Sequence, residues 1–437
     1  MAPSEVLGVA LAGGSGVRAR PLTLKATNYI RSKATVRFLG RRVIDWELLS
    51  FKAQGIVNFL VLAKGKANRY QIKGQVGYGE GLGINLRYAP RAFDPLDRGS
   101  ADAVLRNLGY LGTEGPALVF PVDSLIDFDL DGLVEQFSRV RAPLTLLSMW
   151  VPAGEAAGRY GLVLTGPDRR VRGFVEKPSL EAILDAYPPP DGVRGEDTRV
   201  PVNAGFYWMD GPAAVRFDRD PALRERRCHR LDFGLDFLPW LIEQGESVYE
   251  FPANQVGDLG NLTSYLDTMV RVLSGGFPSL DRFLPDPWHA ARRVFLGSGT
   301  EVPAEASAWE NTLVGEQCRI GPGVMITNSS IGDECIIEAG AIIESSSLED
   351  GTFVGEGARV ERSSVGVMAE IHSRVARPTR LRGAGIGDEV VIEEGAVLDG
   401  TVVHPRLLLP PGYHDGPVEL STSEDVLRRF VRGAQGA

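Results

Sequence analysis

The sequence predicts an α/β protein: a Rossmann-like, doubly wound, mostly parallel sheet, followed by a C-terminal left-handed parallel β-helix. Two patterns predict this fold class. Apolar runs alternate with helix-like segments through the first half of the chain, as in a parallel sheet with helices between its strands. From Leu313 onward, an aliphatic residue often followed by Gly or Glu recurs about every six positions. Such a period is typical of a β-helix, whose stacked coils bury their aliphatic positions against one another.

Length and composition agree with a two-domain protein of the cytoplasm. The chain has 437 residues, which exceeds one ordinary core, so we expect domains over residues 1–287 and 288–437. No apolar run approaches the roughly 20 residues of a membrane span, and the start lacks a signal-peptide pattern. Three cysteines without metal or disulfide spacing favour a reducing compartment. The net charge of −9 argues against general binding of nucleic acid.

The first domain contains an alternating series of strands and helices. Because such sheets bind ligands at the carboxyl ends of their strands, the segments that follow the strands are the candidate site. Residues 185–201 are rich in Pro, Gly and charge and are expected to form a surface loop. We expect strands at residues 6–14, 57–63, 83–89, 116–123 and 143–151, and helices at 41–56 and 100–111.

The second domain carries one interruption and a terminal helix. The six-residue period breaks at residues 372–383, "HSRVARPTRLRG", and then resumes. The final segment predicts a helix capped by Ser423 or Thr422, with Leu427, Phe430 and Val431 on one face.

The stretch "GGSGVRARPLT" has the chemistry of an anion site. Gly13, Gly14 and Gly16 let the backbone approach a ligand and present its N–H groups. Arg18 and Arg20 add positive charge, so a phosphate chain is the expected guest. No Gly-Lys-Ser/Thr follows, which excludes a Walker A loop, and the spacing differs from the dinucleotide fingerprint.

Several ordered motifs across the first 270 residues together resemble the sugar-1-phosphate nucleotidylyltransferases. The resemblance is nearest to the ADP-glucose pyrophosphorylase branch, which joins this catalytic domain to a left-handed β-helix. The motifs that carry it are "GGSGVRARPLT", "KATVRFLG", "RGSADAVLRNL", "VFPVDSLIDFDL", "GRYGLVL", "GFVEKPS", "VNAGFYWM" and "GDLGNLTSYLDT".

The resemblance implies that a sugar 1-phosphate attacks the α-phosphate of an NTP, with ATP favoured, and that pyrophosphate leaves. It implies Asp123 and Asp258 as ligands of Mg²⁺, Arg18 as the holder of the leaving phosphates, and Lys33 as the family lysine. The same resemblance assigns Leu11, Ala12, Gly13, Gly14, Gly16, Arg18, Gly99 and Ser100 to the nucleotide, and Gly161, Glu176, Lys177, Asn203 and Gly205 to the sugar phosphate.

The chain departs from the family pattern in three places. The stretch between "PLT" and Lys33 is longer than usual, so Lys25, Arg31 or Lys33 could supply the lysine's charge. Val122 stands before Asp123 where the family usually has Gly, and its Cβ would crowd a close backbone approach. The motif "VNAGFYWM" resembles thymidylyl-, uridylyl- and guanylyltransferases more than the ADP-glucose enzymes.

These departures leave several alternatives for function. A pseudosugar (cyclitol) 1-phosphate is an alternative acceptor, and a non-catalytic regulatory subunit is a second alternative. A bifunctional acyltransferase would need a catalytic histidine, but His372 and His404 are interpreted as ordinary coil residues. A Rossmann oxidoreductase is disfavoured by the missing dinucleotide spacing. The β-helix suits subunit contacts, so we expect a homo-oligomer, a dimer or a tetramer.

Overall fold

The computed structural model describes residues 3–14, 16–26, 29–93, 98–188, 195–226, 229–303 and 309–435. The chain divides into two compact units. One comprises Met1–Gly14 and Glu47–Val256, and the other comprises Ser15–Trp46 and Gly257–Ala437. The glycine-rich stretch is therefore shared between the two units. The predicted domain boundary at residue 287 stays a prediction.

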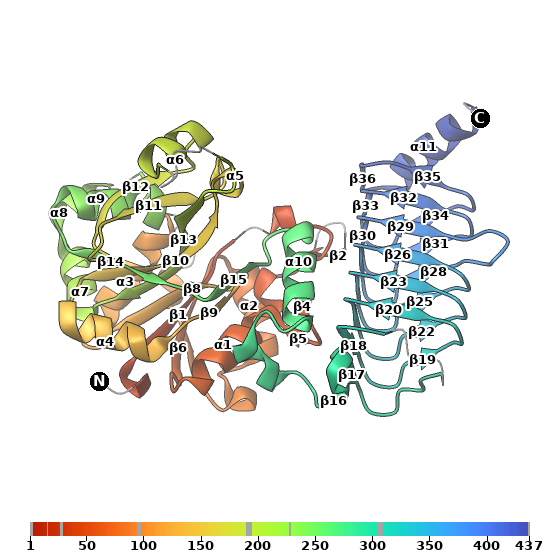
Figure 1. Ribbon diagram of the computed structural model, residues 1–437, viewed down its shortest axis with the longest axis horizontal. Helices are drawn as coiled ribbons and strands as arrows, with labels where there is room; N and C mark the ends of the chain where they lie inside the picture. Colours follow the sequence, from red (N-terminus) through yellow and green to blue (C-terminus); the bar gives the residue numbers. More distant parts are fainter. Residues whose placement is uncertain are drawn as a thin grey trace. The chain divides into compact units, whose positions relative to one another are not determined.

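A mostly parallel sheet flanked by helices forms the first unit (Figure 1). Its strand order is β12-β11-β13-β8-β1-β6-β7, and β10 pairs with both β13 and β14. β8, β1, β6 and β7 run parallel, whereas β13 is antiparallel to β8 and β10. The five predicted strands are confirmed as β1 (Leu7–Ala12), β6 (Asn58–Ala63), β7 (Asn85–Tyr88), β8 (Ala117–Pro121) and β10 (Leu144–Pro152). The other strands of this sheet are β11 (Gly161–Thr165), β12 (Val171–Glu176), β13 (Arg199–Met209) and β14 (Val248–Pro252). β9 (Ser124–Asp127) and β15 (Gln255–Asp258) form a separate two-stranded sheet.

The two predicted helices of the first half are confirmed as α1 (Val43–Ala53) and α3 (Ser100–Leu111). No helix within the described ranges has both the length and the hydropathy needed to cross a membrane. The other helices are α2 (Lys66–Val76), α4 (Leu130–Val140), α5 (Ala153–Ala156), α6 (Leu180–Ala186), α7 (Gly211–Arg219), α8 (Pro221–Arg226), α9 (Leu238–Glu243), α10 (Leu262–Leu273) and α11 (Ser423–Gln435).

Three stacked parallel sheets form the predicted left-handed β-helix (Figure 1). One residue of each short strand points inward, and these aliphatic side chains fill a continuous interior. Successive coils are 17 residues apart, but the coil that includes the interruption at 372–383 is 21 residues long. The first sheet contains β16 (Pro287–His289), β17 (Val294–Leu296), β18 (Thr312–Val314), β21 (Ser330–Ile331), β24 (Ser347–Leu348), β27 (Ser364–Val365), β30 (Gly385–Ile386), β33 (Val402–Val403) and β36 (Glu419–Leu420).

The remaining strands of the second unit are short. The second sheet of the β-helix contains β19 (Arg319–Ile320), β22 (Ile336–Ile337), β25 (Phe353–Val354), β28 (Glu370–Ile371), β31 (Val391–Ile392) and β34 (Leu408–Leu409). The third contains β20 (Met325–Thr327), β23 (Ile342–Glu344), β26 (Arg359–Glu361), β29 (Arg380–Arg382), β32 (Val397–Asp399) and β35 (His414–Asp415). Two hairpins pair β2 (Leu24–Ala26) with β3 (Tyr29–Ile30) and β4 (Arg37–Phe38) with β5 (Arg41–Arg42).

The terminal helix α11 is confirmed, but two of the three residues predicted for its apolar face do not pack on the β-helix. Thr422 is the capping residue, because its Oγ1 accepts a hydrogen bond from the Asp425 N–H at 3.2 Å. Val426 is the buried residue of the helix, and Phe430 stacks on Tyr413 of the β-helix. Leu427 and Val431 are instead half exposed. The spacing correctly indicated a helix but placed its buried side one residue out of register.

Candidate active site

A cavity of about 290 Å³ lies within the first unit, at the carboxyl ends of β1, β6 and β7. Gly13 and Gly14 follow β1, and Lys64 follows β6, so backbone N–H groups and one ammonium group line the same space. This is the location that the rule for parallel sheets predicts. The remaining lining residues are Leu11, Leu62, Ala63, Ala89, Phe93, Gly99, Ser100, Asp102, Ala103, Arg106, Asn107, Arg230 and Asp232.

The start of α3 forms one wall of this cavity and packs tightly against a neighbouring segment. The N–H groups of Ala101 and Asp102 both donate to the carbonyl oxygen of Leu231, at 3.0 and 3.1 Å. Gly99 has φ +97°, and a Cβ at this position would lie 2.3 Å from the same oxygen. The first amides of the helix are thus already bonded within the protein. Gly99 is required for the close approach of the two segments.

Asp232 connects the cavity wall to the adjoining segment and was not predicted from the sequence. One of its carboxylate oxygens accepts from the Ser100 N–H at 2.9 Å, and the other pairs with the Arg230 guanidinium. Its own N–H donates to the Asp236 carboxylate at 2.8 Å. The sequence did contain a signal for Asp232, because the run "LDFGLDF" includes both Asp232 and Asp236. The carboxylate of an aspartate four residues further along the chain can accept a hydrogen bond from a backbone N–H in the turn before a helix.

The predicted nucleotide-side residues of the first unit gather at this cavity. Leu11, Gly13, Gly14, Gly99 and Ser100 line it, whereas Ala12 is buried within β1 and is not a lining residue.

The predicted sugar-side carboxylate, Glu176, lies at the end of β12 beside two glycines. A Cβ on Gly161, its partner in β11, would lie 2.9 Å from Oε2, and a Cβ on Gly234 would lie 2.8 Å from it. Burial raises the pKa of Glu176 above its usual value, Lys177 opposes that shift, and Asp232 adds to it. The absence of a Cβ at these two glycines thus leaves room for the Glu176 carboxylate between them.

Asn203 and Gly205 form a bulge in β13 that the motif "VNAGFYWM" encodes. Register with β10 shifts between Leu146 and Ser148, and Gly205 has φ +82°, a conformation that favours glycine. Asn203 accepts from the Gly205 N–H at 3.0 Å and donates to the Tyr207 hydroxyl at 2.8 Å.

Tyr207 is a second residue that the sequence did not single out. Its ring stacks on Phe233 with centroids 4.1 Å apart, and burial raises the pKa of its hydroxyl. The charges of Glu176 and Asp232 add to this shift, as nearby carboxylates do. Phe233, which stacks on Tyr207, follows Asp232 directly, and Gly234 lies beside Glu176, so these residues form one cluster within the first unit. Lys177, with φ +49°, follows Glu176 directly and donates its N–H to the Tyr160 carbonyl.

Gly16, Arg18 and Lys33 belong to the second unit and lie on the basic loop, which we define as residues 16–37. Gly16 has φ +71° and begins a short 3₁₀ helix (Val17–Ala19) that carries Arg18 at the surface. Thr23 stabilises this turn, because its Oγ1 donates a hydrogen bond to the Gly16 carbonyl at 2.7 Å. Lys33 begins another 3₁₀ helix (Lys33–Thr35) and is partly buried.

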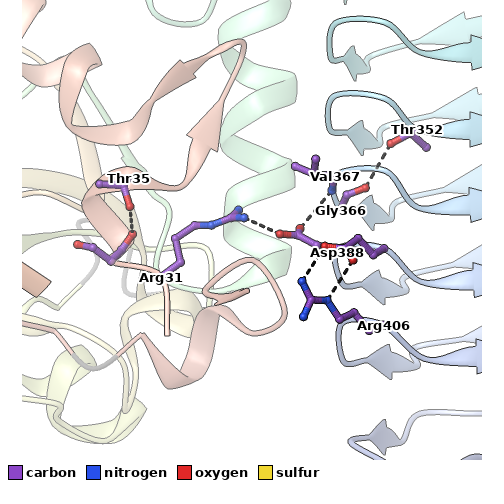
Figure 2. Close-up of polar contacts among 9 residues, drawn as sticks. Arg31, Thr35, Thr352, Gly366, Val367, Asp388 and Arg406 are labelled. Atoms are coloured by element: carbon purple, nitrogen blue, oxygen red, sulfur yellow. Dashed lines mark hydrogen bonds and ion pairs between the residues drawn. The ribbon is translucent and has the colours of Figure 1, made fainter. Parts of the chain in front are cut away.

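The cations of the basic loop have different partners. The Arg31 guanidinium lies 2.6 Å from the Asp388 carboxylate of the β-helix (Figure 2). Arg20 lies 3.7 Å from Glu419, which also contacts His404. Of the three cations considered for the family lysine, Arg31 is thus engaged by the β-helix, and the side chain of Lys25 lies outside the described residues.

The two aspartates implied as metal ligands each lie at a strand end. Asp123 lies in the turn between β8 and β9, and Asp258 ends β15 and accepts from the Gly260 N–H at 2.8 Å. No group of three or more His, Cys, Asp or Glu side chains within the described ranges is arranged to hold a metal. Val122 is 3% exposed and is not among the residues that line the cavity, and the crowding expected from its Cβ stays a prediction.

Comparison with known proteins gives matches over both parts of the chain. Residues 7–275 match the model of the nucleotidyl transferase family, and residues 291–409 match that of the GMPPB C-terminal domain. Glucose-1-phosphate adenylyltransferase 1 of Vibrio parahaemolyticus is 28% identical over 298 residues, which cover 62% of this chain and 68% of the relative.

Two further relatives match to a similar degree. Glucose-1-phosphate adenylyltransferase 1 of Vibrio cholerae is 27% identical over 60% of this chain and 64% of its own length. Glucose-1-phosphate adenylyltransferase of Anaeromyxobacter sp. is 30% identical over 59% of this chain and 61% of its own length. The matches to the last two thus span less than two thirds of those relatives. Because the family model covers more than half of the chain, this protein belongs to the nucleotidyl transferase family.

Proposed function

We propose that the protein is a Mg²⁺-dependent nucleotidylyltransferase that joins an NTP, with ATP favoured, to a sugar 1-phosphate. The observation that carries this proposal is the cavity at the strand ends, where Gly13, Gly14, Gly99 and Ser100 meet. Its glycine-rich wall suits a triphosphate, and its apolar wall, with Leu11 and the other aliphatic side chains, suits a base. The relatives named glucose-1-phosphate adenylyltransferases support ATP and glucose 1-phosphate as the first pair to test.

In the proposed reaction, an oxygen of the sugar phosphate forms a bond to the α-phosphorus of the NTP. The bond from that phosphorus to the β-phosphate oxygen breaks, and pyrophosphate leaves with its electron pair. Both reactants are anions, so positioning and positive charge supply most of the rate enhancement. We assign Arg18 and Lys33 to the phosphates of the leaving group. We assign Lys177 to the sugar phosphate and Glu176 to the sugar hydroxyls.

Asp123 and Asp258 fit the donor chemistry of Mg²⁺. The ion takes oxygen ligands and is usually held by one or two carboxylates together with substrate phosphates, so a larger protein cluster is not required. When bound, Mg²⁺ would neutralise charge on the phosphates.

The acceptor is the less defined half of the proposal. The bulge at Asn203–Tyr207 follows a motif unlike that of the ADP-glucose enzymes, which favours a modified acceptor such as a cyclitol 1-phosphate as the alternative. A regulatory subunit without activity is the remaining alternative.

The decisive experiment follows pyrophosphate release by the purified protein with Mg²⁺, each common NTP and a panel of hexose and cyclitol 1-phosphates. Release with one pair identifies the reaction and its substrates. If no pair reacts but NTP binds, the acceptor lies outside the panel. If NTP does not bind either, the protein is a regulatory subunit and the proposal is wrong.

The variant Asp123→Asn tests the metal ligand. It keeps the shape of the side chain but removes its charge, so we expect turnover to fall by at least about 100-fold while the thermal midpoint of unfolding stays close to that of the wild type. Normal turnover in this variant would remove Asp123 from the proposed site.

We also propose a homo-oligomer, a dimer or a tetramer, assembled through the β-helix. Light scattering of the purified chain tests this directly, and a monomeric mass would contradict it.

A further inference from the structure

The basic loop is bound to the β-helix at several points within the second unit. Asp388, at a corner of the β-helix, contacts Arg31 at 2.6 Å; the two side chains are 10% and 16% exposed. Asp350, two coils earlier on the same side, pairs with Arg37 at 3.2 Å. Such half-buried, charge-assisted contacts fix geometry more firmly than exposed ion pairs.

Asp388 is itself held rigidly. Its second carboxylate oxygen accepts from the Val367 N–H at 3.1 Å, so the coil before it orients the carboxylate toward Arg31 (Figure 2). A backbone bond from the Arg406 N–H to the Asp388 carbonyl, at 2.9 Å, connects it to the coil after it. The carboxylate is thus presented by a stacked scaffold whose position is set by its neighbours.

From Arg31, hydrogen bonds continue to the glycine turn. The Arg31 N–H donates to the Thr23 carbonyl at 2.7 Å, and Thr23 Oγ1 donates to the Gly16 carbonyl at 2.7 Å. Thr23 is 1% exposed, so water does not compete for these bonds. Asp388 therefore connects through Arg31 and Thr23 to the turn that carries Arg18, and Lys33 lies two residues beyond Arg31.

Apolar packing supports the same attachment. A Cβ on Gly385 of the β-helix would lie 2.6 Å from Cδ of Pro21 in the basic loop, so the proline ring packs directly on the backbone of Gly385. Tyr265 of α10 donates to the Arg37 carbonyl at 2.9 Å and lies 3.3 Å from the Ser347 hydroxyl of the β-helix.

We propose that the β-helix positions the basic loop for catalysis, with Asp388 as a positioning residue that acts through Arg31 on Arg18 and Lys33. This inference rests on the proposed function, because it assigns those two cations to the substrate phosphates. The proposal also explains why the stretch between "PLT" and Lys33 is longer than in the family pattern. The added residues supply an arginine for the β-helix, and the phosphate-binding charge stays with Arg18 and Lys33.

The test compares Asp388→Asn and Arg31→Gln with the control Asp399→Asn. Asp399 belongs to the same β-helix, and its ion pair with Arg382 of the β-helix is more than half exposed. Hydrogen exchange of peptides covering residues 16–37, measured by mass spectrometry on the full chain, reports how firmly the loop is held. Steady-state pyrophosphate release reports kcat and KM.

We expect faster exchange in the loop for Asp388→Asn and for Arg31→Gln, but not for Asp399→Asn. We expect kcat to fall by about tenfold in both variants, with the KM for the sugar phosphate within about twofold of wild type, because a small misplacement acts on the transition state. The double variant should be no worse than either single one, and the exchanged pair Arg31→Asp with Asp388→Arg should recover part of the loss.

Unchanged exchange in Asp388→Asn would overturn the proposal, and so would faster exchange with normal kcat. Additive losses in the double variant would mean that Arg31 acts on substrate directly, which also contradicts it. If the wild type releases pyrophosphate with no substrate pair, the proposed function fails and with it the catalytic role of Asp388. The exchange data would then still decide whether the β-helix holds the loop.

Discussion

At the scale of single residues, Glu176 links an unusual environment to a measurable pH dependence. Burial raises its pKa, and only the charged carboxylate accepts hydrogen bonds from sugar hydroxyls through both oxygens. As the pH falls, Glu176 should therefore be protonated earlier than an ordinary glutamate. We expect kcat/KM for the sugar phosphate to decline on the acid side at a pH above 4.5, the usual value of this group.

The variant Glu176→Gln should lower kcat/KM for the sugar phosphate by about tenfold or more and remove this acid decline. The substrate's own ionisation is the same in both proteins, so the difference between the two profiles isolates Glu176. Glu181→Gln, at an exposed carboxylate of α6, is the control and should keep the wild-type profile. An unchanged acid limb in Glu176→Gln would exclude this residue as its origin.

Glu349 is a buried carboxyl of the β-helix with a pKa raised to about 7, first by burial and then by Asp350, while Arg31 lowers it. A folded-state pKa above the unfolded value of 4.5 means that the folded state binds the proton more tightly. The stability contributed by Glu349 is therefore greatest below pH 4.5, falls as the pH rises toward 7, and is constant above that. For this single group, the free energy of unfolding falls by at most about 1.4 kcal/mol per pH unit.

We expect Glu349→Gln to flatten the pH dependence of the thermal unfolding midpoint between pH 5 and pH 7. This interval lies between the unfolded-state pKa of 4.5 and the folded-state pKa of about 7. Differential scanning calorimetry across that range measures it. Asp399→Asn, at an exposed ion pair of the β-helix, should leave the wild-type slope intact. Equal slopes in wild type and Glu349→Gln would show that other groups dominate the dependence.

At the scale of elements, the start of α3 shows how a glycine shapes the cavity. Gly99→Ala would bring a methyl group 2.3 Å from the Leu231 oxygen at a φ of +97°, so the wall must move. We expect the KM for NTP to rise by about tenfold or more and the thermal midpoint to fall, as kinetics and calorimetry would measure. Gly112→Ala, at the other end of α3, is the matched control.

Gly112 also has a positive φ, +60°, but nothing lies within 4 Å of an added Cβ. Its substitution should cost only the backbone strain, about 1 kcal/mol, and leave the KM unchanged. If the two variants had the same KM, the contact with Leu231 would not shape the nucleotide site.

Local patterns predicted the elements well but not their long-range partners. The alternation of strands and helices, the six-residue period and the glycines after β1 are properties of short windows, and the structure confirms them. The contact between Arg31 and Asp388 joins residues 357 positions apart, and no window of sequence contains both. The role of Asp232 depends likewise on a bond to Ser100, 132 residues away.

At the scale of the whole molecule, the two compact units predict an unexpected result of truncation. The match to the nucleotidyl transferase family ends at residue 275, and the sequence suggested a boundary at 287. The basic loop nevertheless belongs to the same unit as residues 257–437. A chain that ends at residue 287 would contain the region that matches the family but lack Asp350 and Asp388, so its basic loop would lose the partners that fix it.

We therefore expect the chain of residues 1–287 to lose pyrophosphate release by at least about tenfold, even if its first unit still binds NTP. A chain that ends at residue 422 is the control, because it lacks only α11 and keeps both aspartates. Kinetics and NTP binding, compared across the three lengths, separate the outcomes. Full turnover by residues 1–287 would show that the loop reaches its working position without the β-helix, and that the boundary at 287 separates two independent domains.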